Sequence, residues 1–239
     1  MKRNTTLLIG FVLICPLLAQ AAMSVKIVQL RGEVKVRRGV EEKWQAAANG
    51  MLLEEIDTIM TLEGGEVELE LGNRVTFRLG SNAILDIADL REITERELFL
   101  ILMSQKVGKL SPRPEKIPLR IGEVSAVRGS PFKSADSTSP NAATAWWRME
   151  ANAAQALQAQ NFLPNAALKL HRLKGKFPQR QDCGEVSFAL ARAFEALRQP
   201  GRARDEYQAT LDECKKQSCE DAAAQNRRAE THAALQRLQ

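Results

Sequence analysis

The sequence predicts a protein of the β + α class, with an all-β domain followed by an all-α domain. Three observations lead to this prediction. Apolar and charged residues alternate between Val25 and Ile87, which is typical of strands with one buried face. Residues 133–143 are mostly Ser, Thr, Pro and Ala without periodicity, which indicates a linker. From residue 144 to Gln239 the chain is rich in Ala, Leu, Gln, Glu and Arg, which favours helices throughout.

Residues 1–22 have the features of a secretory signal peptide. Lys2 and Arg3 precede the apolar run Leu7–Leu18, and Ala19-Gln20-Ala21 offers a small-x-small cleavage pattern. The run is shorter than the roughly 20 residues that a membrane-spanning helix needs. We therefore expect a periplasmic protein with no stable membrane span after cleavage. An inner-membrane protein anchored by the uncleaved signal is the alternative.

The β domain is expected over residues 23–132. Its clearest strands are 66–71 and 74–79, in which apolar residues alternate with glutamates and with arginines. Gly72-Asn73 separates them by two residues, which predicts a tight hairpin. Glutamates then face arginines across the hairpin, an arrangement that suits a solvated sheet face better than a ligand site. The apolar run Leu98–Met103 fits either a buried strand or a short buried helix.

Several short elements of the β half occur in a characteristic order. These are Gly32 with Val34 and Val36, Trp44, Gly50, the segment Ile56-Asp57-Thr58-Ile59-Met60-Thr61, Gly72, Gly80-Ser81-Asn82, and Val127-Arg128-Gly129-Ser130-Pro131-Phe132. In this order and spacing they resemble the FecR domain family over about residues 25–132. The resemblance implies a β-rich periplasmic domain, a sandwich or a solenoid-like wrap, that binds a protein or envelope ligand. It gives structural roles to Gly32, Trp44, Gly50, Asp57, Gly72, Gly80, Asn82, Arg128 and Gly129.

The chain departs from the family pattern in two ways. Ile56 stands where the family has a glycine, so this turn must be built differently. The family also includes signal transducers with a cytoplasmic anti-sigma region and a membrane span, which the short export signal of this chain does not match. The sigma-factor role is therefore not transferred.

The helical half, residues 144–239, contains a degenerate repeat. Small and large residues at Ala154, Leu157, Ala166, Leu170, Leu173 and Pro178 recur at Ala191, Phe194, Ala203, Tyr207, Thr210 and Leu211. Small residues let two antiparallel helices approach closely, and this pattern is similar to that of tetratricopeptide repeats. An alanine-rich helical hairpin of no particular family is the alternative. Residues 222–238 are expected to form a final capping helix.

Three cysteines remain after signal cleavage, namely Cys183, Cys214 and Cys219. An exported chain permits disulfides, and an odd number leaves one thiol over. Cys183 is expected at the start of one helix and Cys214 at the end of its antiparallel partner. We therefore expect one disulfide, joining Cys183 to Cys214 or to Cys219, with a structural role.

Composition and motifs argue against an enzyme and against nucleic-acid binding. The net charge of +5 is mild, and no basic-aromatic interleaving is present. The sequence contains no nucleophile elbow, phosphate loop or paired metal-ligand spacing, so we expect no cofactor and no metal. Asp57 is better explained as a turn residue than as a catalytic acid.

Trp146 and Trp147 are the candidate partner-binding residues. Neighbouring positions on a helix lie about 100° apart, so both rings cannot face the same core easily. An exposed tryptophan near a linker indicates contact with a partner, whereas packing between the two domains is an equal alternative.

These observations predict a non-enzymatic periplasmic adaptor. Its β module would bind or dock, and its helical repeats would present a groove to another envelope protein. Two alternatives remain open at this point. One is an envelope signal-sensing protein of the FecR kind that acts through a separate membrane partner, and the other is a protein whose β domain binds cell-wall glycan.

Overall fold

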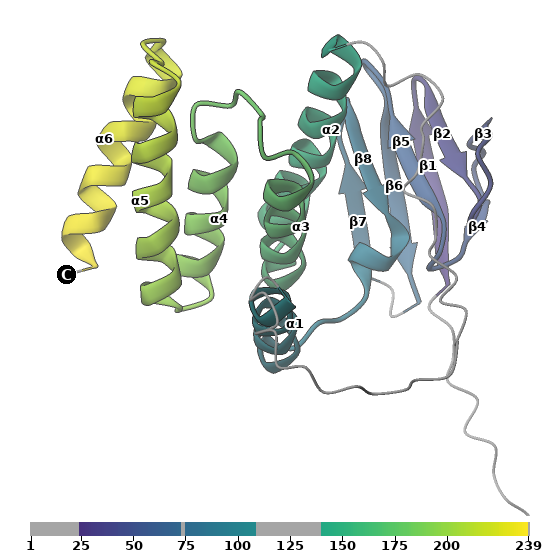
Figure 1. Cartoon of the computed structure of the whole chain (residues 1–239). Helices are drawn as coiled ribbons and strands as arrows, with labels where there is room; N and C mark the ends of the chain where they lie inside the picture. The colour runs from purple at the N-terminus through teal and green to yellow at the C-terminus, as the bar shows by residue number, and fades with distance from the viewer. Residues whose placement is uncertain (1–23, 73–74, 109–139, 239) are drawn as a thin grey trace, which may run out of the picture.

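The structure, a computed structural model, describes residues 24–72, 75–108 and 140–238. Within these ranges an antiparallel β region is followed by a helical region, which confirms the β + α class (Figure 1). The predicted signal peptide 1–22, the residues Arg128 and Gly129, and most of the predicted linker lie outside the described residues.

The described β region consists of two four-stranded antiparallel sheets. The strands are β1 (Val25–Arg31), β2 (Val34–Arg37), β3 (Trp44–Ala46), β4 (Leu52–Leu53), β5 (Thr58–Thr61), β6 (Glu66–Leu71), β7 (Thr76–Leu79) and β8 (Ala83–Asp86). One sheet has the order β4-β1-β6-β7 and the other has the order β3-β2-β5-β8. Apolar side chains of both sheets share one core, so the β region is a sandwich and not a solenoid-like wrap.

The alternation of the sequence sets which face of each strand is buried. In β6, Val67, Leu69 and Leu71 are buried while the glutamates between them point outward. β6 pairs antiparallel with β7, as the Gly72-Asn73 signal predicts, and Glu68 lies opposite Arg78. The predicted rows of acidic and basic residues are therefore neighbours on the outer face of this sheet.

β1 contains an irregularity that the alternation does not show. Its register against β6 shifts between Ile27 and Gln29, so that Val28 is an extra residue and is 48% exposed. Such a bulge bends the strand and re-aims the side chains that follow it. The turn after β1 needs Gly32, which has φ +64°; a Cβ there would lie 2.5 Å from the carbonyl oxygen of Gly64.

The turn at Ile56 forms without the family's glycine. Ile56 is absent from the described residues with positive φ, and its side chain is 67% exposed. The Asp57 amide donates to Glu54 O at 3.0 Å, and the Asp57 carboxylate accepts from the Glu54 amide at 2.9 Å. These reciprocal hydrogen bonds close the turn with ordinary backbone angles, so isoleucine is tolerated there.

The described helical region follows a short 3-10 helix, Ile87–Leu90. Its helices are α1 (Glu95–Gly108), α2 (Pro140–Ala159), α3 (Leu163–Lys176), α4 (Glu185–Ala196), α5 (Pro200–Lys216) and α6 (Ala222–Arg237). Of the two alternatives for the run Leu98–Met103, the structure shows a helix, α1. Leu98 and Leu102 are buried, whereas Phe99 and Leu100 are exposed, as expected for one buried helix face. Among the described helices, none is long and apolar enough to cross a membrane.

Helices α2 to α6 follow one another as neighbours, joined by short connections (Figure 1). Ten of the twelve repeated positions are buried, namely Ala154, Leu157, Ala166, Leu170 and Leu173 in α2 and α3, and Ala191, Phe194, Ala203, Tyr207 and Thr210 in α4 and α5. The other two are not, since Pro178 is exposed and Leu211 is half-buried. Small residues at these positions allow close approach of the helices, and Phe194 and Tyr207 fill the space between them. Residues 177–184, between α3 and α4, form the longest connection from α2 to α6.

α2 and α3 lie against the sandwich, between it and the other helices of the row (Figure 1). Ala153, Leu157 and Ala166 are fully buried in the same core as the strands. The Phe162 ring packs edge-on against Phe77, with centroids 5.5 Å apart. The β half and the first helical pair therefore share one hydrophobic core.

The Gln160 side chain covers the outer edge of β7. Its Oε1 accepts from the Arg78 amide at 2.8 Å, and its Nε2 donates to the Arg78 carbonyl at 2.7 Å. One side-chain amide thus makes the two hydrogen bonds that a further strand would make. This closes an edge that would otherwise be open to pairing with another chain.

Candidate functional site

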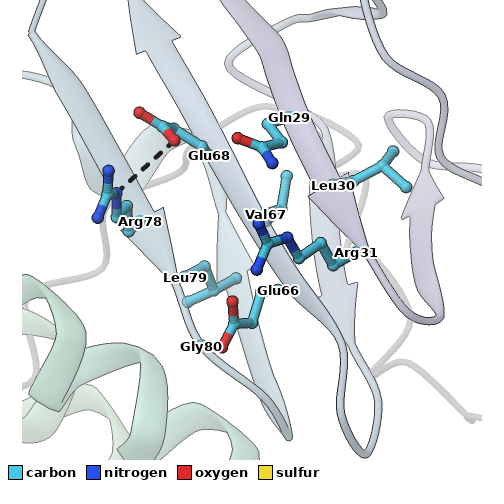
Figure 2. A pocket seen from close by; sticks show the side chains of 9 residues that line it. All are labelled: Gln29, Leu30, Arg31, Glu66, Val67, Glu68, Arg78, Leu79 and Gly80. Atoms are coloured by element: carbon cyan, nitrogen blue, oxygen red, sulfur yellow. Dashed lines mark ion pairs between the residues drawn. The ribbon is translucent and has the colours of Figure 1, made fainter.

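The outer face of β1, β6 and β7 carries a groove of about 350 Å³. Figure 2 shows its lining residues, which are Gln29, Leu30, Arg31, Glu66, Val67, Glu68, Arg78, Leu79 and Gly80. The bulge at Val28 lies immediately before the residues that β1 contributes. Arg31 and Arg78 come from the two strands on either side of β6, and the two glutamates come from β6 itself.

Arg78 of this groove is open to solvent, and its glutamate partner is so in part. Arg78 Nε lies 3.6 Å from Glu68 Oε2, and the side chains are 77% and 25% exposed. Arg31 stands opposite Glu66 in the register of β1 and β6. Exposed pairs of this kind are screened by water and salt and add little stability. These side chains can therefore exchange their mutual contacts for contacts with a ligand that carries both charges.

A second polar cluster, at the interface of the sandwich and the helices, is buried. Lys169 Nζ of α3 lies 2.6 Å from Asp89 Oδ2, and each side chain is 6% exposed. Arg172 Nη1 contacts the other oxygen of Asp89 at 3.3 Å. Asn165 Nδ2 donates to the carbonyl oxygens of Asp89 and Arg91, at 2.7 and 2.8 Å. This cluster fixes α3 to the segment that follows β8.

The ammonium group of Lys169 stays charged despite its burial. Burial by itself lowers the pKa of Lys169, but the negative charges of Asp89 and Asp86 outweigh it and raise that pKa. A buried charge of this kind is stable only while its partner is in place, because either group alone would be an unpaired charge in the interior. The cluster therefore has a structural role at the interface.

Asp57 has a structural role in the turn before β5, where its backbone carbonyl accepts from the Ile87 amide at 2.9 Å. Its carboxylate accepts hydrogen bonds from the amides of Glu54 and Gly39, and Arg38 Nη1 lies 2.6 Å away. Burial raises the pKa of Asp57, but the two amides and Arg38 outweigh it and hold that pKa below its usual value. One bonded amide belongs to Glu54, three residues earlier in the same turn, and the other belongs to Gly39 in a different turn. Asp57 thus joins two turns.

The other residues of the family resemblance lie at turns and strand ends. Gly50 and Asn82 have left-handed φ values of 81° and 52°. Gly72 follows β6 and Gly80 follows β7, where it borders the groove. The half-buried Trp44 ring of β3 lies under the Arg37 guanidinium, 5.3 Å from its centroid. Of these residues, the structure brings only Gly80 into the groove.

The two tryptophans of α2 have different environments. Trp147 is buried, with 4% exposure, in the helical core together with Leu98 and Leu102 of α1. Trp146 is half-buried. Trp147 therefore packs inside the protein, and of the two only Trp146 remains in part accessible to a partner.

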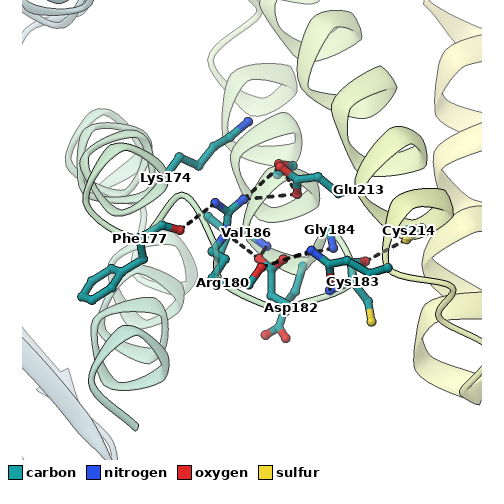
Figure 3. A network of polar contacts seen from close by, with 12 residues as sticks. Lys174, Phe177, Arg180, Asp182, Cys183, Gly184, Val186, Glu213 and Cys214 are labelled. Atoms are coloured by element: carbon teal, nitrogen blue, oxygen red, sulfur yellow. Dashed lines mark hydrogen bonds and ion pairs between the residues drawn. The ribbon is translucent and has the colours of Figure 1, made fainter. Parts of the chain in front are cut away.

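Cys183, just before α4, and Cys214, near the end of α5, lie beside a polar network (Figure 3). Cys183 is bonded to Cys219, and Cys214 is a free, buried thiol. Next to them, Arg180 contacts Asp182 at 2.8 Å and Glu213 at 3.0 Å. Asp182 in turn accepts from the Gly184 and Val186 amides at the start of α4. The network ties the α3–α4 connection to α5.

The sequence favoured a solvated face over a ligand site for the rows of glutamates and arginines, and the buried cluster was not predicted. The residues that β1 contributes to the groove follow the bulge at Val28, which no turn residue indicates. The cluster joins residues 80 positions apart. A lysine and an asparagine on the apolar side of a helix, at positions 169 and 165, were the available signal for the cluster. Among the described residues no group of three or more His, Cys, Asp or Glu side chains could hold a metal ion.

Comparison with protein-family models, with curated proteins and with solved structures finds no match to this chain. The functional argument therefore rests on the residues and their geometry.

Proposed function

We propose that this protein is a non-enzymatic binding protein of the periplasm that acts as an adaptor. In this proposal a FecR-like β module binds a ligand through the groove on β1, β6 and β7. Tetratricopeptide-like helices hold a second envelope protein. The mechanism is recognition, with no chemical step.

The observation that carries the proposal is the connection between the sandwich and the helices. Lys169, Asp89 and Asn165 form a buried polar contact, and Leu157 and Ala166 lie in the sandwich core. The groove face and the outer helices α4 to α6 are held at a fixed separation by this interface (Figure 1). An adaptor requires two surfaces in a constant relative position.

The chemistry of the groove supports a protein ligand. Its arginines and glutamates alternate across three strands, and complementary charges of this kind give specificity and orientation in protein recognition. An extended segment bearing both acidic and basic side chains would match this lining. The Cys183–Cys219 bond is in keeping with an oxidising compartment such as the periplasm.

The proposal can be tested by chemical crosslinking in intact cells, followed by affinity purification and mass spectrometry. The groove variant combines Arg31→Glu and Arg78→Glu. Its matched control is Arg96→Glu, an exposed arginine of α1 outside the groove. We expect a discrete protein partner with the natural chain and with the control, and loss of that partner with the groove variant.

Other outcomes favour the alternatives. Recovery of a membrane transducer would indicate a signal-sensing role of the FecR kind. Sedimentation with purified cell wall, abolished by the groove variant, would indicate glycan binding. Retention of every partner by the groove variant would contradict the role of the groove, because only a partner held by the helices should remain. Trp147→Ala is unsuitable as a binding test because Trp147 is buried in the core.

A further inference from the structure

The three cysteines are in mutual contact around one disulfide. Cys183 and Cys219 are bonded, with their Cα atoms 5.9 Å apart. The Sγ of Cys214 donates a hydrogen bond to the carbonyl oxygen of Cys183 at 2.7 Å. The carbonyl oxygen of Cys214 accepts from the Cys219 amide at 3.3 Å. The free thiol thus touches one half of the disulfide and is joined through its backbone to the other half.

We propose that this cluster is a thiol–disulfide exchange site, in which Cys214 replaces Cys219 as the partner of Cys183. The proposal goes beyond the adaptor function and does not depend on it. It rests on the contacts of the three cysteines, on the positive charge beside them, and on their positions in the chain.

The exchange is balanced within the protein. The Cys214 thiol loses its proton to solvent, and the thiolate attacks the Sγ of Cys183. The Cys183–Cys219 bond breaks as the Cys183–Cys214 bond forms, and Cys219 leaves as a thiolate that takes up a proton. One disulfide and one thiol exist before and after the step, so no oxidant or reductant is consumed.

Two arginines of α6 bond to the backbone of the three cysteines. Arg227 Nη1 donates to the Cys183 carbonyl at 3.1 Å, and its Nη2 lies 3.9 Å from Glu185. Arg228 Nη2 donates to the carbonyl oxygens of Cys214 and Cys219. Guanidinium groups near a cysteine favour its thiolate form, so the positive charge beside this cluster is of the sign that thiol–disulfide exchange requires.

The positions of the cysteines allow the exchange without breaking a helix. Cys183 lies in the connection between α3 and α4, and Cys219 lies in the connection between α5 and α6. Cys214 lies near the end of α5, which extends to Lys216. The movement that the exchange requires is thus confined to helix ends and connections.

The product of the exchange is a free Cys219 thiol. Cys219 is 6% exposed, and its neighbours Ser218 and Glu220 are exposed. As a thiolate it would attack a disulfide such as oxidised glutathione, forming a mixed disulfide with one sulfur and releasing the other as a thiol. The site would then couple the oxidation state of the surroundings to the way α6 is held.

The test is disulfide mapping of the folded, full-length mature protein. The protein is incubated with a reduced and oxidised glutathione mixture without denaturant, alkylated with N-ethylmaleimide, and digested with trypsin under non-reducing conditions. Lys215 and Lys216 separate Cys214 from Cys219, and Arg192 lies between Cys183 and both, so each pairing gives a distinct linked peptide.

We expect the natural chain to give both Cys183–Cys219 and Cys183–Cys214 peptides, with N-ethylmaleimide on Cys219 in the second form. Cys214→Ser should lose the second pairing and the labelling of Cys219 entirely. Cys219→Ser should form the Cys183–Cys214 bond. Mapping the natural chain decides the matter even where a variant fails to fold, because it needs no substitution. Only Cys183–Cys219 peptides with the label confined to Cys214, or no label at all, would overturn the proposal.

Discussion

Two of the regions in which acidic and basic side chains face each other differ sharply in burial, the interface between sandwich and helices and the outer face of the sandwich. At the interface, Lys169 and Asp89 are each 6% exposed and lie 2.6 Å apart. On the outer face, Arg78 is 77% exposed and lies 3.6 Å from Glu68. The first pair is stabilising only when complete, because either partner alone is a buried charge. The second pair can be opened at little cost, which suits a surface that exchanges partners.

The largest effect is expected from Lys169→Ala. The substitution leaves the Asp89 carboxylate buried without its ammonium partner, and we expect the free energy of unfolding to fall by about 3–5 kcal/mol. Urea unfolding followed by circular dichroism measures this value. Arg172→Ala is the matched control, since Arg172 contacts the same carboxylate but is 52% exposed, and its loss should cost less than about 1 kcal/mol. Equal losses of unfolding free energy in the two variants would contradict the contrast between a buried and an exposed partner of Asp89.

The pH dependence of the stability that Lys169 and Asp89 contribute follows from the direction of the Lys169 pKa shift. The pKa of Lys169 is raised in the folded state above its ordinary value of 10.5. The contribution to stability is therefore fully present at neutral pH and is lost only as pH rises through the raised pKa. Unfolding of the natural chain between neutral pH and strongly alkaline pH should show this loss, and Lys169→Ala should not.

A smaller effect is expected from Asp57→Asn, in the turn before β5. An asparagine keeps only one oxygen, so its NH2 group would face either the Gly39 or the Glu54 amide, and the charge of the Arg38 contact would be lost, at about 1.5–3 kcal/mol. The pKa of Asp57 is lowered from 3.8, so its contribution is present above that value and is lost as pH falls below it. The stability difference between the natural chain and the variant should shrink between pH 5 and pH 2. A difference that is constant with pH would argue against an ionised Asp57 as the cause.

Gln160→Ala should cost about 1 kcal/mol, because it removes two hydrogen bonds from an edge that water can reach in part. Hydrogen exchange of the Arg78 amide should become faster in the variant. Gln158→Ala, in the last turn of α2 just before Gln160, is the control and should leave that amide protected. Unchanged exchange in Gln160→Ala would show that the edge is covered by other groups.

The smallest effect on stability is expected from Arg78→Ala. Loss of an exposed ion pair at 3.6 Å should change the free energy of unfolding by less than about 0.5 kcal/mol. Urea unfolding checks this value, and ligand binding at the groove, as proposed above, should nonetheless be reduced. A loss comparable to that of Lys169→Ala would mean that the outer face has a structural role after all.

The sequence was informative where local patterns decide the structure. Alternation from Glu66 to Leu71 predicted both the strand and its buried face, and small residues at Ala166 and Ala203 marked helix contacts that are indeed buried. The run Leu98–Met103 stayed ambiguous because strands and helices can both bury consecutive apolar residues. The structure resolves it through Phe99 and Leu100, which are exposed on the far side of α1.

Contacts between distant segments were beyond the reach of these patterns. Nothing near Asp89 in the chain indicates that its partner is Lys169. The choice between Cys214 and Cys219 as the partner of Cys183 depends on how the end of α5 meets the connection to α6, which spacing alone leaves open. The residues that β1 contributes to the groove likewise follow an extra residue, Val28, which the alternation of apolar and charged residues does not indicate.

The shared core has a consequence for the order in which the chain folds. Ala153, Leu157 and Ala166 complete the core of the sandwich, yet they follow every strand in the chain. Strands β7 and β8 would present uncovered edges and apolar side chains until α2 and α3 form, and such edges promote association between chains. A fragment that ends with α1 should therefore aggregate, whereas one that extends to Lys176 carries what its strands need to remain separate.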